Sequence, residues 1–490
     1  MAGSERDKGG SGPGKDDGVD VYPADAHDLQ TYRDANALLG QMRVPQLIDS
    51  GNPNQKLYVA VLDGTGNDMF TADTAHQTGV ARIYQDIRNQ HNAGDLPNVA
   101  AGYVTGPGTQ SGLKGTSDSA KGHTFEERAE TMYKMFIEQS ADWLRRNPDA
   151  DIRVAAMGFS RGAEQAAFFT RLVDERGIQD PTGAKYTYDN NGLVSSVQYG
   201  KPPLVEPGKV AQAVMLHDPV GTGNPLDYDR RLPPSVMSGL QVFSEDERRN
   251  LFKASDHLPR TNGANTLSEN GRFLNVTVGG AHSDIGGAYP LKGLGTLSEN
   301  LARDYINGLS DKPILGRQQE PADPNQYVVH RSEQHQWFYR TSEFDRAGVR
   351  QINPNLAPDA AANVDRTRKE AIDEGLSAQF QYRQIPTFPI TGPAAQDQRQ
   401  GAVVPATNPL FERLAAGAQN NDPNVLREVS KEYLPTQGAW LQQGREANQP
   451  PPPQLSQPQP VPAQEPQVVE TLSSGGDARW RRMSLCRISR

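Results

Sequence analysis

The sequence predicts an α/β protein in which a mostly parallel central sheet carries helices on both faces. One observation is an apolar run at 57–62 that ends abruptly in Asp63 and a Gly-rich turn, which is typical of a buried strand. A second is the strand pattern at 152–157, followed at once by a tight turn and a helical pattern from about 161 to 175. Strands that alternate with helices in this way form parallel sheets.

The segments between these strands give the next elements. A strand is expected over 98–104. The helix after it should begin at Thr124, because Thr124 and Glu127 have the Thr-x-x-Glu pattern of a capping box, and it should end near Arg146, just before a proline. One or two short helices are expected within 24–46, where apolar residues recur among polar ones.

The second half of this region continues the alternation. Further strands are expected at 210–216 and 273–278. A helix should begin near Thr296, with Glu299 completing another capping-box pattern.

Charge and composition exclude several classes of protein. The 490 residues include 50 Lys and Arg against 59 Asp and Glu, and the net charge of −9 does not favour a nucleic-acid binder. No apolar run is long enough for a membrane-spanning helix, and the first residues lack the apolar region of a secretory signal peptide. Because Cys486 is the only cysteine, neither an intramolecular disulfide nor a cysteine zinc site is expected.

The strongest chemical signal is Gly158-Phe159-Ser160-Arg161-Gly162, a G-x-S-x-G pattern between a predicted strand and a predicted helix. The pattern places a serine on a sharp turn with its hydroxyl above the sheet edge, and the glycines let strand and helix approach closely. We interpret Ser160 as a nucleophile. The alternative is a structural turn with a buried capping serine.

A serine nucleophile needs a base and an acid that orients the base, and in such folds the acid and then the histidine follow the serine in the chain. Asp284 and Asp218 each follow a predicted strand, and we favour Asp284 as the acid. Asp218 then either supports the triad residues or anchors a loop, and it is the alternative acid.

The histidine that best suits the role of base is His330, which directly follows the short β-prone run 327–329. His335 is more typical of a surface or packing residue. His282, two residues before Asp284, is expected to be a loop histidine that hydrogen-bonds the backbone.

The oxyanion of an acyl-transfer reaction needs two donors. One should be the backbone N–H of Arg161, at the start of a helix. The other should come from Gly64 or Thr65, in the loop after the first strong strand. The alternative is that Asp63 and these glycines only form a turn or hold a phosphate.

Six sequence blocks in order resemble the α/β-hydrolase domain of the Tle group of bacterial type VI secretion lipase effectors. The resemblance spans about 57 to 335, and the blocks are Leu62–Asp68, Gly106–Thr109, Gly158–Ala163, Asp218–Gly221, Asp246–Arg249 and Gly280–Gly287.

The resemblance implies an α/β-hydrolase fold and a phospholipase with a triad of Ser160, Asp284 and His330. We therefore expect a serine hydrolase of the phospholipase A type that needs no cofactor and acts on membrane phospholipid as an antibacterial or anti-host toxin. It would be made in the bacterial cytoplasm without a cleavable signal and secreted into a target cell. Its expected partners are a component of the secretion apparatus and an immunity protein.

Two other functions stay open from the residues alone. One is a non-catalytic binding or toxin-carrier module with the same fold. The other is a metal-dependent phosphodiesterase, in which His217, Asp218, His282 and Asp284 would hold a divalent cation together with Asp63 or Asp68.

The segments 222–270 and 287–325 are expected to be insertions that form a cap over the site. The first contains many apolar residues, among them Leu226, Met237 and Leu240, and these could form a lid that faces lipid. The alternative for the same residues is packing on the core.

Composition divides the chain into four predicted regions, with Gly, Ser and charged residues at the start and Pro and Gln near the end. They are a disordered arm with a short helical lead-in (1–54), the α/β-hydrolase catalytic domain (55–345), a helical or irregular extension (346–445) and a disordered Pro/Gln-rich linker with a basic tail (446–490).

Overall fold

The computed structural model describes six stretches of the chain. They are 18–108, 124–221, 224–249, 252–258, 265–334 and 370–393. All of them belong to the first of two units, 1–397 and 398–490. The predictions for the N-terminal arm, for His335 and for the linker and basic tail lie outside the described residues.

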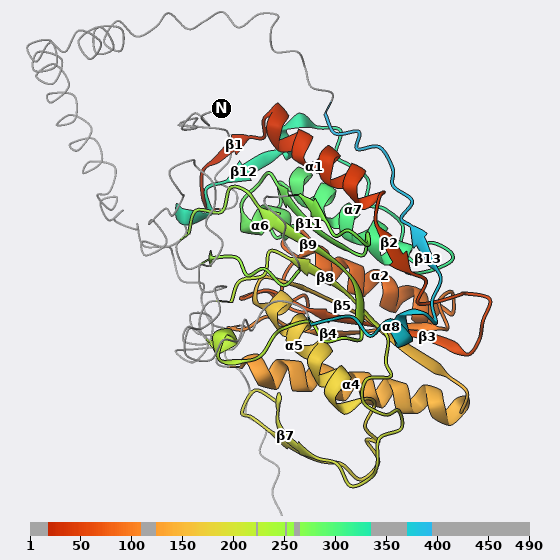
Figure 1. Ribbon diagram of the computed structural model, residues 1–490. Helices are drawn as coiled ribbons and strands as arrows, with labels where there is room; N and C mark the ends of the chain where they lie inside the picture. Colours follow the sequence, from red (N-terminus) through yellow and green to blue (C-terminus); the bar gives the residue numbers. More distant parts are fainter. Residues whose placement is uncertain are drawn as a thin grey trace, which may run out of the picture. The chain divides into compact units, whose positions relative to one another are not determined.

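A seven-stranded sheet forms the centre of the described chain (Figure 1). All neighbouring strands are parallel except the first pair, which is antiparallel. The order across the sheet is β10 (Thr266–Leu267), β11 (Phe273–Val278), β9 (Val236–Ser244), β8 (Gln212–His217), β5 (Asp151–Phe159), β3 (Gln55–Leu62) and β4 (Val99–Val104).

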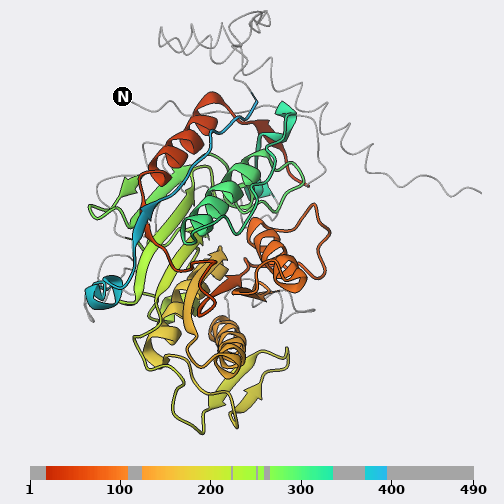
Figure 2. The same ribbon diagram turned by 90° about the vertical axis from the view of Figure 1, so that its right-hand side faces the viewer.

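Helices cover both faces of the sheet, as Figures 1 and 2 show. One face packs against α1 (Ala26–Leu39), α2 (Gly79–Ala93) and α7 (Gly293–Gly308), and the other against α4 (Phe125–Arg146) and α5 (Arg161–Arg176). Side chains of β3 alternate between these two cores: Val59 and Val61 face the first, Tyr58 and Ala60 the second. The predicted fold class is confirmed.

In the described stretches, three pairs of short strands lie outside the central sheet. They are β1 (Val21–Pro23) with β12 (Val328–His330), β2 (Arg43–Pro45) with β13 (Tyr382–Gln384), and β6 (Lys185–Tyr188) with β7 (Val194–Gln198). The first two pairs tie residues near 21–45 to segments far along the chain, and Tyr32 and Leu39 of α1 are buried in the core. The lead-in is thus packed on the sheet, while the four region boundaries stay predictions.

The largest error of the sequence-based prediction concerns the expected cap. Within 222–270, β9 is a strand of the central sheet, and Met237 and Leu240 are buried in its core. Within 287–325, α7 is one of the helices that cover the sheet. A lipid-facing lid built on Met237 and Leu240 is therefore wrong.

Two helix starts differ from the capping-box predictions. α4 begins after Thr124 as expected, but the Thr124 hydroxyl accepts a hydrogen bond from Arg128 Nε at 2.8 Å and does not cap the helix. α7 begins at Gly293, three residues before Thr296. A real capping box occurs at α1, where Asp25 and Asp28 each accept the other's backbone N–H.

The remaining described elements are single turns. They are η1 (Asn224–Asp227), α6 (His282–Ile285), η3 (Pro324–Gln326), η4 (Ser332–Gln334) and α8 (Glu374–Ser377). Within the helical or irregular extension predicted at 346–445, residues 370–393 are described and contain α8; the rest of that extension lies outside the described residues. No described helix combines the length and apolar character needed to cross a membrane.

Candidate active site

Ser160 lies at the turn between β5 and α5, at the carboxyl edge of the central sheet. Its φ is 58°, in a region that costs free energy for any residue other than glycine. Flanking glycines permit the turn, because a Cβ on Gly158 would lie 2.2 Å from the carbonyl oxygen of Gly162, and one on Gly162 would lie 2.2 Å from that of Leu62. The G-x-S-x-G pattern therefore has the strained strand–turn–helix setting of a nucleophile elbow.

The Ser160 hydroxyl does not cap the helix that follows it. Ser160 occupies the N-cap position of α5, yet its side chain makes no capping hydrogen bond there. Its backbone N–H donates to the His217 carbonyl at 2.9 Å, and its carbonyl accepts the Val220 N–H at 3.3 Å. The alternative of a capping serine is not supported, and the elbow is fixed by backbone contacts to the last residue of β8 and to the segment that follows it.

Asp284 and His330 form a buried pair at the same edge of the sheet. Asp284 lies in α6, and His330 is the last residue of β12. One carboxylate oxygen contacts the imidazole Nδ1, and the other accepts the His330 backbone N–H at 2.9 Å. The Tyr289 ring stacks on the imidazole with centroids 3.8 Å apart. The ring of His330 is thus held in one orientation.

Burial raises the pKa of the Asp284 carboxyl, and the contact with His330 lowers it only in part. The same carboxylate also accepts the Ala281 N–H at 2.9 Å. These contacts favour the ionised form, which is the form that can hold and stabilise a protonated imidazole.

A second buried Asp–His pair joins Asp218 to His282. Asp218 directly follows β8 with φ 39°, and its Oδ2 lies 2.6 Å from His282 Nδ1. Its Oδ1 accepts the Ser244 N–H at 3.1 Å. Burial lowers the pKa of His282, and Asp218 offsets part of that effect. Both residues were predicted to lie at the site, but their pairing was not predicted.

The Phe159 side chain connects this second pair to the elbow. Its ring stacks on His282 with centroids 4.5 Å apart, while Phe252 packs edge-on against the same imidazole at 5.0 Å. A Cβ on Gly286 would lie 2.3 Å from the Phe159 ring, so only glycine allows this approach. The block from His282 to Gly286 therefore packs directly beside Ser160.

The proposed oxyanion loop differs in detail from the prediction. The Gly64 N–H donates to Asp63 Oδ1 at 2.7 Å, and is thus engaged within its own turn. The Thr65 side chain accepts a hydrogen bond from Arg161 Nη1 at 2.8 Å, which ties this loop to the start of α5. Of the two predicted donors in the loop, Thr65 suits the role better than Gly64.

Asp63 acts as the anchor of that loop. Its carboxylate accepts hydrogen bonds from Tyr103 Oη at 2.6 Å and from Thr78 Oγ1 at 2.9 Å, besides the one from Gly64. Burial raises the pKa of Asp63 to about 6 although these donors lower it. This role corresponds to the alternative in which Asp63 and the neighbouring glycines form a structural turn.

Two acidic residues outside the expected set also shape the site. Asp246 Oδ2 accepts the Gly280 N–H at 2.9 Å, and Glu247 Oε2 accepts the His282 N–H at 3.3 Å. Glu247 also pairs with Arg249 at 2.8 Å. Both belong to the block Asp246–Arg249 that carried the resemblance, which was the one signal in the sequence that could have pointed to them.

The residues of the metal hypothesis do not come together as one ligand set. His217 Nε2 lies 3.2 Å from Ser298 Oγ, and burial lowers the pKa of His217 to about 4. His282 is held by Asp218, and Asp284 is held by His330. Across the described part of the chain, no three His, Cys, Asp or Glu side chains form a group that could hold a metal ion.

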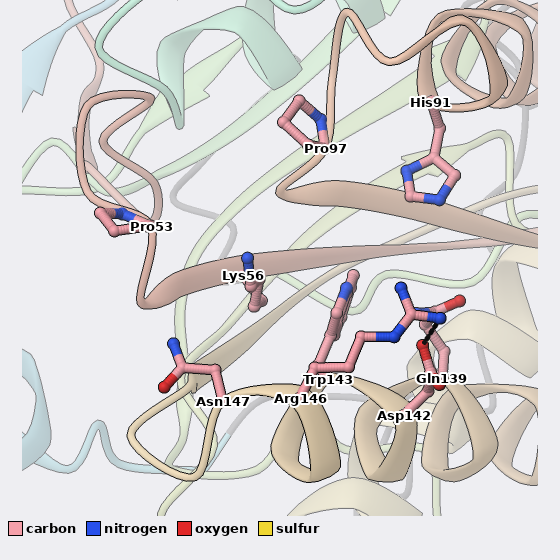
Figure 3. A pocket seen from close by; sticks show the side chains of 9 residues that line it. All are labelled: Pro53, Lys56, His91, Pro97, Gln139, Asp142, Trp143, Arg146 and Asn147. Atoms are coloured by element: carbon pink, nitrogen blue, oxygen red, sulfur yellow. Dashed lines mark ion pairs between the residues drawn. The ribbon is translucent and has the colours of Figure 1, made fainter.

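A surface pocket of about 390 Å³ lies away from this constellation (Figure 3). Lys56 comes from the start of β3, and Trp143 and Arg146 come from the last turns of α4, so the pocket is at the amino edge of the sheet. Arg146 pairs with Asp142 at 2.8 Å. The pocket contains none of the candidate catalytic residues.

Residues 56–202 match the family model described as "T6SS, Phospholipase effector Tle1-like, catalytic domain". This segment is therefore similar to the Tle1-like catalytic domain family. The match includes Ser160 and the loop of Thr65 but ends before Asp218, so neither Asp–His pair lies in the matched part. None of the curated proteins matches the chain.

Three solved structures that resemble the chain share between 13% and 19% identity with it. An uncharacterized protein from Pseudomonas aeruginosa matches at 13% identity and TM-score 0.34, over 62% of this chain and 52% of its own. The Tle1 effector bound to the VgrG spike of the type VI secretion system matches at 19% identity and TM-score 0.28, over 48% of this chain and 51% of its own. Dienelactone hydrolase from Anabaena variabilis matches at 13% identity and TM-score 0.19, over 40% of this chain and 64% of its own. The chain thus spans about half the length of the first two.

Proposed function

We propose that the chain is a serine-dependent carboxylic ester hydrolase of the phospholipase A type, with Ser160 as the nucleophile. The observation that carries the proposal is the strained backbone of Ser160, with φ 58°, at an elbow whose neighbours include buried Asp–His pairs. Strain of this kind persists only where the surrounding structure enforces it, and it is common at catalytic positions. The family description adds the substrate class, a phospholipid.

The proposed reaction uses His330 as the base. Its Nδ1 is held by Asp284, which leaves Nε2 as the nitrogen that accepts the Ser160 proton. The Ser160 oxygen then attacks the acyl carbonyl carbon and forms a tetrahedral intermediate. His330 returns the proton to the leaving lysophospholipid oxygen, and water, activated by the same imidazole, releases the fatty acid from Ser160.

The oxyanion of the intermediate is stabilised by the backbone N–H groups of Arg161 and Thr65. Arg161 is the first residue of α5, where the partial positive charge of the helix end favours an anion. The bond between the Arg161 guanidinium and Thr65 Oγ1 keeps the two segments in register. Preorganised donors of this kind contribute more than donors that must first reorient.

The pair of Asp218 and His282 is the competing acid and base. The Asp218 carboxylate holds His282 Nδ1 in the same way, and the His282 imidazole stacks on the ring of Phe159, the residue before Ser160. We assign it a supporting role, in which Asp218 and His282 hold the elbow and the α6 segment together. Separate substitution of the two histidines decides between the assignments, as described below.

The cellular role follows from the family rather than from the geometry. A type VI secretion phospholipase effector acts in a target cell, so we propose that this chain is made in the producer's cytoplasm, delivered by the secretion apparatus, and neutralised in the producer by an immunity protein. In co-culture, a producer with wild-type protein should reduce the survival of a sensitive strain, and the Ser160→Ala producer should not. Equal killing by both would contradict an enzymatic toxin.

Product analysis tests the proposed reaction. The full chain is incubated with mixed phospholipid vesicles in the presence of a chelator, and the products are separated by lipid mass spectrometry. A phospholipase A yields free fatty acid and lysophospholipid, and the Ser160→Ala variant yields neither. Diacylglycerol or phosphatidic acid as the products, or an activity abolished by the chelator, would instead support the metal-dependent phosphodiesterase.

A further inference from the structure

Two exposed apolar side chains lie in loops at the catalytic edge of the sheet. In the described part of the chain, five large apolar side chains are exposed: Phe70, Tyr188, Leu204, Leu226 and Phe388. Phe70 is 64% exposed and Leu226 is 39% exposed. These two come from different loops, and their position relative to Ser160 sets them apart from the other three.

The strands β3 and β8 flank β5 on its two sides, and all three are parallel. In register, Leu62 pairs with Gly158, and Phe159 pairs with His217, so the three strands end at one edge. Phe70 lies in the segment after β3, and Leu226 lies in the segment after β8. The two side chains therefore come from the loops on either side of the elbow.

The backbone of Phe70 is held by a hydrogen bond, while most of its side chain is exposed. Its backbone N–H donates to Asp68 Oδ1 at 2.9 Å. The ring touches Tyr103 edge-on, with centroids 5.7 Å apart, and the Tyr103 hydroxyl binds Asp63 at the end of β3. A large apolar ring is thus presented to solvent from a loop that is anchored beside the catalytic edge.

Leu226 is presented in a similar way. It lies in η1, which packs against α5, and the preceding residue of the same turn, Pro225, is buried. Two residues later, the Tyr228 ring packs on Phe125 and Phe168 with centroids 5.1 and 5.3 Å apart. The turn is therefore held on the start of α4 and the middle of α5, while the Leu226 side chain remains partly in water.

We propose that Phe70 and Leu226 form a docking surface for a zwitterionic phospholipid bilayer and bring Ser160 to the lipid headgroup region. This inference rests on the proposed phospholipase function, because an enzyme that hydrolyses bilayer lipids must contact the surface of the bilayer. Exposed aromatic and aliphatic side chains gain free energy when they enter the boundary between headgroups and acyl chains.

The charge beside the two side chains favours a neutral surface over an anionic one. Asp68 and Asp227 lie next to Phe70 and Leu226, and the whole chain carries a net charge of −9. Lys292 is a nearby cation, and its Nζ contacts the Ala75 carbonyl of the Phe70 loop at 3.2 Å. Among these described residues, the acidic side chains outnumber Lys292, so anionic headgroups would gain little from this surface, in contrast to the basic clusters that recruit proteins to anionic leaflets.

The test compares one double variant with a matched control in the full chain. The docking variant is Phe70→Ser with Leu226→Ser, and the control is Tyr188→Ser with Phe388→Ser, which removes exposed rings of the β6 hairpin and of the segment after β13. Each protein is assayed on phosphatidylcholine vesicles and on a short soluble ester. Vesicle binding is measured by flotation in the Ser160→Ala background.

We expect the docking variant to lose roughly tenfold in vesicle hydrolysis and in vesicle binding, as follows from removing two apolar contacts, and to keep wild-type activity on the soluble ester. The control should keep all three. Wild-type vesicle binding by the docking variant, or an equal loss on both substrates, would overturn the proposal. So would binding that rises with phosphatidylglycerol content and does not need Phe70 or Leu226.

The failure of the proposed function gives a different result. If the wild-type chain hydrolyses neither vesicle lipid nor any soluble ester, the phospholipase assignment is wrong. Flotation still measures docking in that case, because it needs no turnover.

Discussion

The carboxylate of Asp284 holds His330 at two points, the imidazole Nδ1 and the backbone N–H, the latter at 2.9 Å. The ring and the main chain of one histidine are thus fixed by one carboxylate, and Tyr289 closes the face of the ring. This is the relationship expected of an acid that orients a catalytic base. If Asp284 and His330 have these roles, substitution of either residue should lower the catalytic rate.

Replacing Asp284 by Asn should reduce turnover by about 10⁴-fold, because an amide can hold the imidazole in the wrong tautomer and cannot stabilise its protonated form. Asp218→Asn should cost much less. The measurement is kcat on a p-nitrophenyl ester with purified variants whose folding is checked by circular dichroism. The opposite ranking would transfer the role of the acid to Asp218.

The two histidines should behave differently when combined with loss of the serine. His330→Ala should be nearly as severe as Ser160→Ala, and the double variant should be no worse than either, because members of a triad act as a unit. His282→Ala should retain more activity, with its loss explained by lower stability. Additive losses for Ser160 and His330, together with non-additive losses for Ser160 and His282, would identify His282 as the base.

Glu164 should be important for stability rather than for chemistry. It lies fully buried one turn after Ser160, contacts Arg230 Nη1, and lies 3.0 Å from His257 Nε2. Burial raises the pKa of Glu164, but Arg230 and His257 together lower it to about 2, against an ordinary value of 4.5. Glu164→Gln should cost about 3 kcal/mol of unfolding free energy at pH 7, because it leaves Arg230 buried without its carboxylate.

The sign of the pH dependence follows from that lowered pKa. The stabilisation is complete above about pH 4.5 and is lost as the pH falls toward 2, because the folded state resists protonation of Glu164. Urea unfolding of wild type and Glu164→Gln is measured at pH 7, 5 and 4. The difference between their unfolding free energies should be nearly the same at pH 7 and 5 and smaller at pH 4. A gap that widens on acidification would contradict the ion-pair account.

Leu240 belongs to the core of the sheet, so its truncation should affect every substrate alike. Leu240→Ala should lower the unfolding free energy by about 3 kcal/mol through loss of buried apolar contact and the cavity left behind. The specific activity of the folded fraction should be the same on vesicles and on a soluble ester. Normal stability with a selective loss on vesicles would restore the rejected lid.

Much of the central fold is predictable from local patterns, and β9 shows where such patterns fail. The strand contains Ser238 and Gln241, which look unsuited to a buried strand, yet both are satisfied there: Ser238 Oγ bonds Tyr305 Oη at 2.6 Å, and Gln241 Nε2 donates to the Ser255 carbonyl at 3.0 Å. These partners are distant in sequence, so periodicity alone cannot reveal them.

The candidate active site also combines features that local sequence patterns predict with features that depend on distant contacts. The elbow is predictable because strand, turn and helix are contiguous in the sequence, whereas the contact of Asp218 with His282 joins residues 64 positions apart. That contact depends on where β9 enters the sheet. The engagement of the Gly64 N–H by Asp63 is set by side-chain geometry within one turn, which residue types alone do not determine.

The central claim is that Ser160 is the nucleophile, and active-site labelling tests it most directly. The full chain and the Ser160→Ala variant are each treated with a fluorophosphonate, digested and analysed by mass spectrometry. The residual esterase activity of each treated sample is measured in parallel. The account predicts one adduct on Ser160, loss of activity in proportion to labelling, and no adduct in the variant. Full ester hydrolysis after complete treatment with Ser160 unlabelled, or an adduct on a different residue that tracks the loss of activity, would contradict it.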